Sequence, residues 1–238
     1  MSRFLRCFRL PSAGRNGLFL GLGCAVLLLA AAPAAHAQFS VPSSGTEVRD
    51  PAALKPPAGA RVAIVEFADL ECPACASANP LLKAAVEKYK VPWVRHDFLI
   101  PSHKWSTYAA VNARWFDAQN VALGGEYRDQ VFANQTFIYG PFALRRFTED
   151  FAQGHGIELP SSLDPDGKLT AQVLADNEVG RRTGIQHTPT VFVVTADSKG
   201  APFIEVQHID QDLDQMIAQA LADTASAPQE PAKKPSGK

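Results

Sequence analysis

A short apolar segment that runs directly into a pair of cysteines places the strongest constraint on the fold. Arg61–Ala68 reads RVAIVEFA, a continuous apolar run with β-branched residues that is typical of a strand covered on both faces. Cys72 and Cys75 follow, and apolar residues then recur at helical spacing as far as Lys90. Val91–Ile100 predicts a second strand. Strand, helix and strand over this length predict a βαβ unit with parallel pairing.

The helix predicted after the first cysteine has one apolar face and contains two prolines. Its expected apolar face consists of Leu81, Leu82, Ala85, Val86 and Tyr89. Pro73 suits the first helical position, where a missing N–H costs nothing. Pro80 falls inside the helix and is expected to kink it.

The remainder of the chain predicts a helical stretch followed by two strands and a closing helix. The segment from Trp105 to about Arg182 reads as mainly helical. Thr190–Thr195 and Pro202–His208 predict two strands joined by a turn at Asp197–Gly200, and Ile209–Ala222 predicts the last helix. The predicted fold class is therefore α/β, with a βαβ half, a helical insertion and a ββα half.

The first 37 residues read as an export signal. Four arginines precede an apolar run of about 15 residues, Leu18–Ala32, and Ala35 and Ala37 form an A-x-A cleavage site before Gln38. The apolar run is shorter than the roughly 20 residues that a membrane-spanning helix needs. We therefore expect a cleaved signal peptide and a periplasmic or otherwise exported protein, with an uncleaved N-terminal anchor as the alternative.

Composition divides the rest of the chain into a leader, a domain and a tail. Residues 38–60 contain four prolines and predict an extended leader, with one short strand near Thr46–Arg49. Residues 61–223 form the predicted domain, with the insertion at about 101–183, and 224–238 read as a disordered tail. After cleavage 19 basic and 24 acidic residues remain, which argues against a nucleic-acid partner.

The cysteine pair has three possible roles: a metal clip, a structural staple or a working dithiol. Signal cleavage removes Cys7 and Cys24, so one C-x-x-C pair remains in a compartment where disulfides persist. A structural zinc site needs four ligands, and the remaining histidines show no ligand-pair spacing: His96, His103, His155, His187 and His208. A staple closing so small a loop would gain little from its cross-link.

A working dithiol explains why the cysteines stand at the start of a helix. Free N–H groups and the positive end of the helix dipole stabilise a thiolate at Cys72. Cys75 lies one turn further along the helix and is expected to be less exposed. We therefore expect Cys72 to be the nucleophile and Cys75 the resolving thiol, with no metal involved.

Several motifs together resemble the DsbA family of thioredoxin-like proteins. They are Glu66 ahead of the cysteines, the C-P-x-C motif that opens a helix, the sequence Thr188-Pro189-Thr190 before a strand, and the helical insertion between the halves. The resemblance covers roughly residues 61–222. It implies a thioredoxin-like fold and an exported thiol:disulfide oxidoreductase whose redox centre is the Cys72–Cys75 disulfide, without a cofactor.

The resemblance also implies roles for three residues outside the cysteine motif. A carboxylate in an apolar strand is costly to bury, and burial would raise the pKa of Glu66 and suit it as a proton acceptor for Cys75. A solvated strand end, or an ion pair with Arg61 or Lys83, is the alternative reading of Glu66. Pro189 is expected to be cis, and the backbone of Thr188 is expected to pair with a substrate strand.

Residues around the cysteines bear on how strongly the dithiol oxidises. The strongest oxidants of the family carry a histidine between the cysteines, whereas this chain has Pro73-Ala74, so a milder oxidant is expected. His187 could tune a nearby thiolate or be an ordinary exposed loop residue. Glu71 would oppose a thiolate if it pointed inward, so we expect it to face solvent.

These observations favour an oxidase that donates its disulfide to cysteine-containing exported proteins. The resemblance implies a quinone-linked membrane partner that reoxidises the dithiol, and we expect a monomer. A reductase or an isomerase would use the same chemistry, although the leader is too short and too rich in proline for the dimerisation domain of an isomerase. A chaperone-like or copper-handling module is the alternative from a different class.

Overall fold

The computed structural model describes residues 45–196 and 202–225. The predicted signal peptide, the turn at Asp197–Gly200 and the tail beyond Ala225 lie outside these residues. Within them, no helix is long and apolar enough to cross a membrane.

The centre of the fold is a four-stranded mixed sheet in the order β2-β1-β3-β4. Its strands are β1 (Val62–Ala68), β2 (Trp93–Asp97), β3 (Thr190–Thr195) and β4 (Phe203–Glu205). β1 pairs in parallel with β2 and antiparallel with β3, and β3 pairs antiparallel with β4. The predicted βαβ and ββα halves and the predicted parallel pairing are confirmed.

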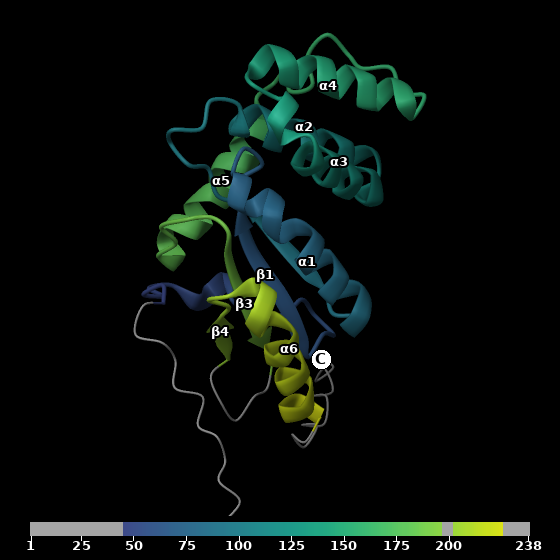
Figure 1. The fold of residues 1–238 in the computed structure, drawn as a ribbon. Helices are drawn as coiled ribbons and strands as arrows, with labels where there is room; N and C mark the ends of the chain where they lie inside the picture. Colours follow the sequence, from purple (N-terminus) through teal and green to yellow (C-terminus); the bar gives the residue numbers. More distant parts are fainter. Residues whose placement is uncertain (1–44, 197–201, 226–238) are drawn as a thin grey trace, which may run out of the picture. The chain divides into compact units, whose positions relative to one another are not determined.

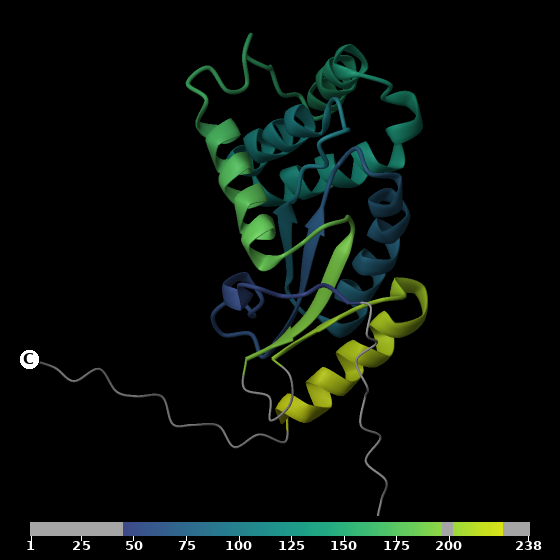
Figure 2. The same ribbon diagram turned by 90° about the vertical axis from the view of Figure 1, so that its left-hand side faces the viewer.

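Helices cover both faces of the sheet and one of its ends (Figure 1). Their bounds are α1 (Pro73–Tyr89), α2 (Ser106–Gln119), α3 (Val121–Ala133), α4 (Pro141–Gly154), α5 (Lys168–Thr183) and α6 (Ile209–Ala225), with 3-10 turns η1 (Pro51–Ala53) and η2 (Gln135–Phe137). α1 and α6 pack on one face, and α5 and η1 pack on the other. α2, α3 and α4 lie beyond the end of β1, as Figure 2 also shows.

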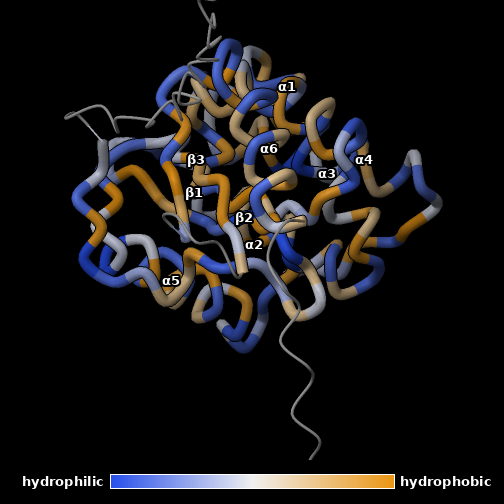
Figure 3. Tube along the Cα trace, turned by 90° about the horizontal axis from the view of Figure 1, so that it is seen from below, coloured by the Kyte–Doolittle hydropathy of each residue, from blue (hydrophilic) through white to orange (hydrophobic). Residues whose placement is uncertain are grey.

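Alternate residues of β1 supply two separate cores, because successive side chains of a strand point to opposite faces. Val62 and Ile64 pack with residues of α1 and α6, whereas Ala63, Val65 and Phe67 pack toward α5 and η1. The apolar strands run between these helix layers in Figure 3. Glu66 therefore points to the same face as Ile64, toward α1, which carries the cysteines.

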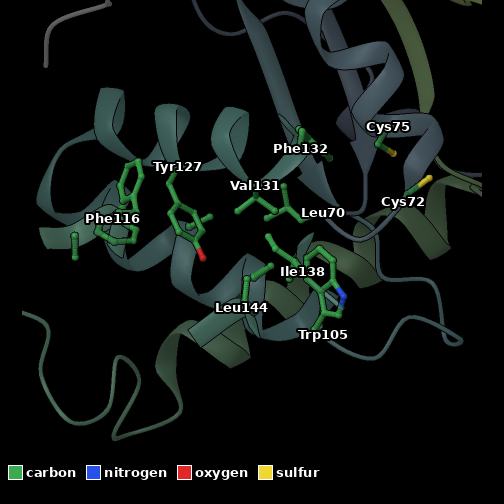
Figure 4. Close-up of a cluster of buried hydrophobic side chains, with 14 residues drawn as sticks. Leu70, Cys72, Cys75, Trp105, Phe116, Tyr127, Val131, Phe132, Ile138 and Leu144 are labelled. Carbon is green, nitrogen blue, oxygen red and sulfur yellow. The ribbon is translucent and has the colours of Figure 1, made fainter. Parts of the chain in front are cut away.

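A third core fills the inserted helices and reaches the cysteines. Phe116, Tyr127 and Phe151 form its aromatic centre, with ring centroids 4.8–5.2 Å apart. Cys72 and Cys75 belong to the same cluster and lie at the opposite end from Phe116 in Figure 4. The insertion therefore packs directly against the start of α1.

Three predictions about local structure are wrong. Residues 46–49 form no strand, because the N–H groups of Thr46 and Arg49 make isolated bonds to the Glu205 carboxylate and the Thr183 carbonyl instead of a strand ladder. Leu81, placed on the apolar face of α1, is 41% exposed. Pro202–His208 contains a strand of only three residues, Phe203–Glu205, although the Val206 N–H still donates to the Val191 carbonyl of β3.

The last helix extends past its predicted end at Ala222 and includes the first two residues of the predicted tail. Thr224 is buried, and its hydroxyl donates to the carbonyl of Ala220 one turn earlier. In turn, the carbonyl of Thr224 accepts from the Arg61 guanidinium. These contacts with the domain hold a turn of helix that composition alone assigns to a tail.

Candidate active site

The two cysteines stand at the start of α1 and have different exposures. Cys72 is the N-cap residue of the helix, and Pro73 occupies its first position, as predicted. Both cysteines are free thiols in this structure. Cys72 is 7% exposed and Cys75 fully buried, which confirms that the second cysteine is the less accessible one.

The surroundings of Cys72 favour its thiolate and lower its pKa to about 5. The largest cause is a hydrogen bond from the Cys75 thiol, and burial opposes it. The Thr188 hydroxyl and the N–H groups of Cys75 and Ala74 stabilise the negative charge further. Cys72 is therefore a thiolate at neutral pH, which is the form that attacks disulfides.

The same hydrogen bond acts in the opposite direction on Cys75. Its pKa is raised because its proton is held by the Cys72 thiolate and because the side chain is buried. One sulfur is thus charged at the rim of the site, while the other is neutral beneath it. This asymmetry separates an attacking thiol from a resolving thiol.

The loop at Thr188–Pro189, distant in sequence, lies against Cys72. The Thr188–Pro189 peptide bond is cis, as predicted. In the thiol form, Cys72 Sγ donates to the Thr188 carbonyl oxygen at 3.4 Å. His187 is exposed, and its Nδ1 lies 3.3 Å from the Thr190 hydroxyl. Thr188 thus hydrogen-bonds to the sulfur through its backbone.

Glu66 is buried in the sheet beneath α1, at 1% exposure. Burial is the main cause that raises its pKa to about 7, and Arg95 and a hydrogen bond from Trp93 partly offset it. The Trp93 Nε1–H donates to Glu66 Oε2 at 3.0 Å. A carboxyl group with a pKa near neutrality can both accept and return a proton at physiological pH.

The charged neighbour of Glu66 is Arg95, not either of the two predicted candidates. Arg95 lies opposite Glu66 in the parallel register of β1 and β2. Arg61 instead binds the end of α6, and Lys83 binds Asp129. The sequence VPWVRHD contained the signal, because the strand register decides which of its residues faces Glu66.

Glu71 is only partly exposed, whereas we expected it to face solvent. Its Oε2 accepts from the backbone N–H groups of Trp105 and Ser106 at 2.6 and 3.0 Å. The first N–H groups of a helix lack partners within it, and a carboxylate is favoured there. The charge of Glu71 is therefore committed to the start of α2.

Gln135, which the sequence did not single out, ties the insertion to the cysteine loop. Its Nε2 donates to the carbonyl oxygens of Leu70 and Cys72, at 2.7 and 3.0 Å. These two bonds hold the backbone on both sides of Glu71. No motif in the sequence marks this contact, because 63 residues separate Gln135 from Cys72.

A groove of about 500 Å³ lies beside the cysteine motif. Ala74 and Leu81 of α1 form one wall, the cis-proline loop His187–Pro189 the second, and residues 205–210 before and at the start of α6 the third. Leu81 is exposed because it lines this groove instead of a core. Among the described residues, no cluster of His, Cys, Asp or Glu side chains is arranged to hold a metal ion.

The fold and the site define a thioredoxin-like protein with a C-x-x-C dithiol and a helical insertion. A family model described as thioredoxin matches residues 58–201, more than half of the chain, so the protein belongs to the thioredoxin family. No curated protein matches the sequence.

Solved structures of DsbA-type proteins share the fold. BdbD from Bacillus subtilis, in its oxidised form, has a TM-score of 0.58 at 17% identity, over 75% of this chain and 98% of that chain. The thiol-disulfide exchange protein α-DsbA2 from Wolbachia pipientis has a TM-score of 0.55 at 16% identity, over 69% and 84%. A periplasmic thioredoxin-like protein from Salmonella enterica serovar Typhimurium has a TM-score of 0.54 at 19% identity, over 70% and 88%.

Proposed function

We propose that this protein is an exported thiol:disulfide oxidase that donates a Cys72–Cys75 disulfide to proteins with reduced cysteines. The observation that carries the proposal is the pairing of a stabilised Cys72 thiolate, with a pKa of about 5, with the buried neutral Cys75 thiol beside a cis-proline loop. The export signal in the sequence and the DsbA-type fold support the compartment and the substrate class.

The exchange proceeds in two balanced steps. A substrate thiolate attacks the Cys72 sulfur of the oxidised protein, the Cys72–Cys75 bond breaks, and Cys75 leaves as a thiolate that takes a proton from the Glu66 carboxylic acid. A second substrate thiolate then attacks the substrate sulfur of the mixed disulfide, and the Cys72 thiolate leaves. The substrate loses two electrons and gains a disulfide, and the protein becomes the dithiol.

The stabilised Cys72 thiolate supports the proposed direction of exchange. Stabilising the Cys72 thiolate stabilises the reduced protein and makes the disulfide more oxidising. Each unit by which the pKa of the Cys72 thiol is lowered raises the reduction potential by roughly 30 mV. The backbone N–H of Ala74 contributes, but the alanine side chain offers no charge or hydrogen bond to the thiolate. We therefore propose a milder oxidant than relatives with a histidine between the cysteines.

The substrate would dock through its backbone. The loop at Thr188–Pro189 lies against the attacking sulfur, where an extended segment can pair with it irrespective of sequence. The groove beside Leu81 would receive a side chain that flanks the substrate cysteine. A quinone-linked membrane protein is the proposed reoxidising partner, and the working unit is a monomer.

Equilibration with glutathione buffers tests the direction. We expect a reduction potential well above that of thioredoxin, and a value below about −250 mV would contradict the oxidase and favour a reductase. Mixing Cys75→Ser protein, as its Cys72 glutathione disulfide, with a reduced peptide that carries a single cysteine should release glutathione and give a mixed disulfide at Cys72. The matched Cys72→Ser variant should form none. Copper or zinc bound stoichiometrically after native purification, and lost in Cys72→Ser, would instead favour a metal-handling module.

A further inference from the structure

Three buried polar atoms around Glu66 have no hydrogen-bond partner within residues 45–196 and 202–225. They are Glu66 Oε1, Asn79 Oδ1 and Arg95 Nη1. Buried polar atoms nearly always find a partner, either in the protein or in ordered water. Three of them in one connected cluster mark a polar interior built around the buried carboxyl group.

Asp129 joins this cluster to the protein surface. Its Oδ1 accepts from Asn79 Nδ2 at 3.1 Å and from Arg95 Nη2 at 3.5 Å, while its Oδ2 accepts from Lys83 Nζ at 2.8 Å. The Asp129 side chain is 20% exposed and that of Lys83 is 52% exposed. Polar contacts therefore lead from the surface, through Asp129, to the guanidinium that lies opposite Glu66.

The position of Arg95 is fixed from two sides. Its guanidinium lies over the Trp93 ring, 3.6 Å from the ring centroid, and the same indole donates its N–H to Glu66. On the other side it meets Asp129, which is carried by α3 of the insertion. Arg95 thus contacts one residue that binds Glu66 and one that belongs to the inserted helices.

We propose that Asp129 is a positioning residue that acts through Arg95 and controls when Glu66 exchanges a proton with Cys75, so that helix α3 tunes the dithiol chemistry of the thioredoxin half. The proposal rests on the oxidase function above and deepens it. Glu66 is the group that exchanges the proton, and the other two act through it.

The two charges act on Glu66 with opposite signs. The positive charge of Arg95 lowers the pKa of Glu66, while the negative charges of Asp129 and of the Cys72 thiolate raise it. Cys75 of α1 also interacts electrostatically with Glu66, and Arg128 of α3 repels Arg95. Because Asp129 also accepts from Arg95, its removal would leave the guanidinium free to interact with Glu66 alone.

Two substitutions separate these effects in the reduced protein. Arg95→Met should move the titration midpoint of Glu66 upward, and Asp129→Asn should move it downward by roughly half a unit to one unit, less than the shift from a charge in direct contact. Glu149→Gln is the matched control, because Glu149 is also an ion-paired acid of the insertion but binds the exposed Arg145. The control should leave the midpoint unchanged.

The readout is an NMR titration of the Glu66 side-chain carboxyl carbon, which does not depend on exchange activity. A protein without oxidase activity that still shows opposite shifts would contradict the proposed function and leave the electrostatic linkage standing. Shifts in the same direction, or none in Asp129→Asn, would overturn the inference even in an active oxidase.

A kinetic measurement connects the linkage to the reaction. The rate at which Cys75 resolves a glutathione mixed disulfide at Cys72 should follow the ionisation of Glu66, so its pH profile should shift to lower pH in Asp129→Asn. A profile that stays in place while the NMR midpoint moves would overturn the proposed control of proton transfer. If Arg95→Met does not fold, Arg95→Lys retains the charge and should keep the midpoint near the wild-type value, and a large shift there would count against the proposal.

Discussion

Two of the polar clusters within the described residues differ in their hydrogen bonding. In the inserted helices, the Tyr127 hydroxyl lies 2.7 Å from the Thr148 hydroxyl, and Asn112 Nδ2 donates to both, at 3.3 and 3.1 Å. Every member of that cluster is neutral, and burial raises the pKa of Tyr127 to about 12, so its proton stays in place. The Glu66 cluster is charged and retains unpartnered atoms.

The difference separates a polar group that stabilises the fold from one that is suited to chemistry. A fully paired neutral cluster repays its desolvation through hydrogen bonds and rigidifies a core. Burial of the Glu66 carboxyl group destabilises its ionised form and raises its pKa to about 7. The group can therefore take up and release protons at neutral pH. Substitutions in the two clusters and at the cysteine loop test this division.

The largest effect is expected from Phe116→Ala in the core of the insertion. Phe116 is fully buried and packs against the rings of Tyr127 and Phe151, so we expect a loss of about 3–5 kcal/mol in unfolding free energy by urea titration. The thiolate absorbance of Cys72 should titrate at its wild-type midpoint. A shifted titration midpoint of the Cys72 thiolate in this variant would show that packing in this core affects the electrostatics of the site.

Glu66→Gln should stabilise the protein at high pH and leave it unchanged at low pH. The folded pKa of Glu66 is about 7, above its usual 4.5, so its contribution to stability is complete below pH 4.5 and is lost as the pH rises through 7. The glutamine side chain of the variant would lack this dependence while keeping the bond from Trp93. Above pH 7 the variant should exceed the wild type by up to about 3 kcal/mol.

The pH dependence of stability should be measured on wild type and Glu66→Gln together, since Cys72 contributes with the opposite sign. Its folded pKa of about 5 lies below its usual value of 9.0, so its contribution is complete above pH 9 and is lost as the pH falls through 5. The difference between the proteins isolates most of the Glu66 term. Equal pH dependence in both would contradict a raised Glu66 pKa.

Tyr127→Phe, unlike Glu66→Gln, should destabilise the protein. Removing the hydroxyl leaves Thr148 and Asn112 with fewer partners, so we expect a loss of about 1–2 kcal/mol in unfolding free energy at every pH below 9. The rate of exchange with a reduced peptide should not change. A slower exchange rate in the folded variant would show that the Tyr127 cluster also affects thiol-disulfide exchange, and it would contradict the proposed difference from the Glu66 cluster.

Thr188→Val should produce the smallest effect. It removes a hydroxyl that stabilises the Cys72 thiolate, so the pKa of Cys72 should rise by less than about one unit and the reduction potential should fall by up to about 30 mV. Thr195→Val is the control, because that hydroxyl donates at the far end of β3 to Pro202. A shift of equal size in the pKa of Cys72 in the control variant would contradict the role given to the Thr188 hydroxyl.

The sequence predicted those parts of the site that depend on neighbours along the chain. The apolar run of β1, Pro73 at the first position of α1 and the lower exposure of Cys75 follow from local periodicity and helix geometry. The cis bond at Pro189 came from the family resemblance, since local physics favours trans. Arg95, Gln135 and the exposure of Leu81 depend on strand register and on segments distant in sequence.

The sequence alone predicted a dithiol at the start of a helix, an acid in the preceding strand and the order of the two halves. These features arise from side-chain periodicity and backbone chemistry within a few residues of one another. The tertiary structure was needed to show which charges face Glu66 and how the Thr188 loop contacts Cys72. Those contacts join residues far apart along the chain, and the pKa of a buried group depends on how the folded chain encloses it.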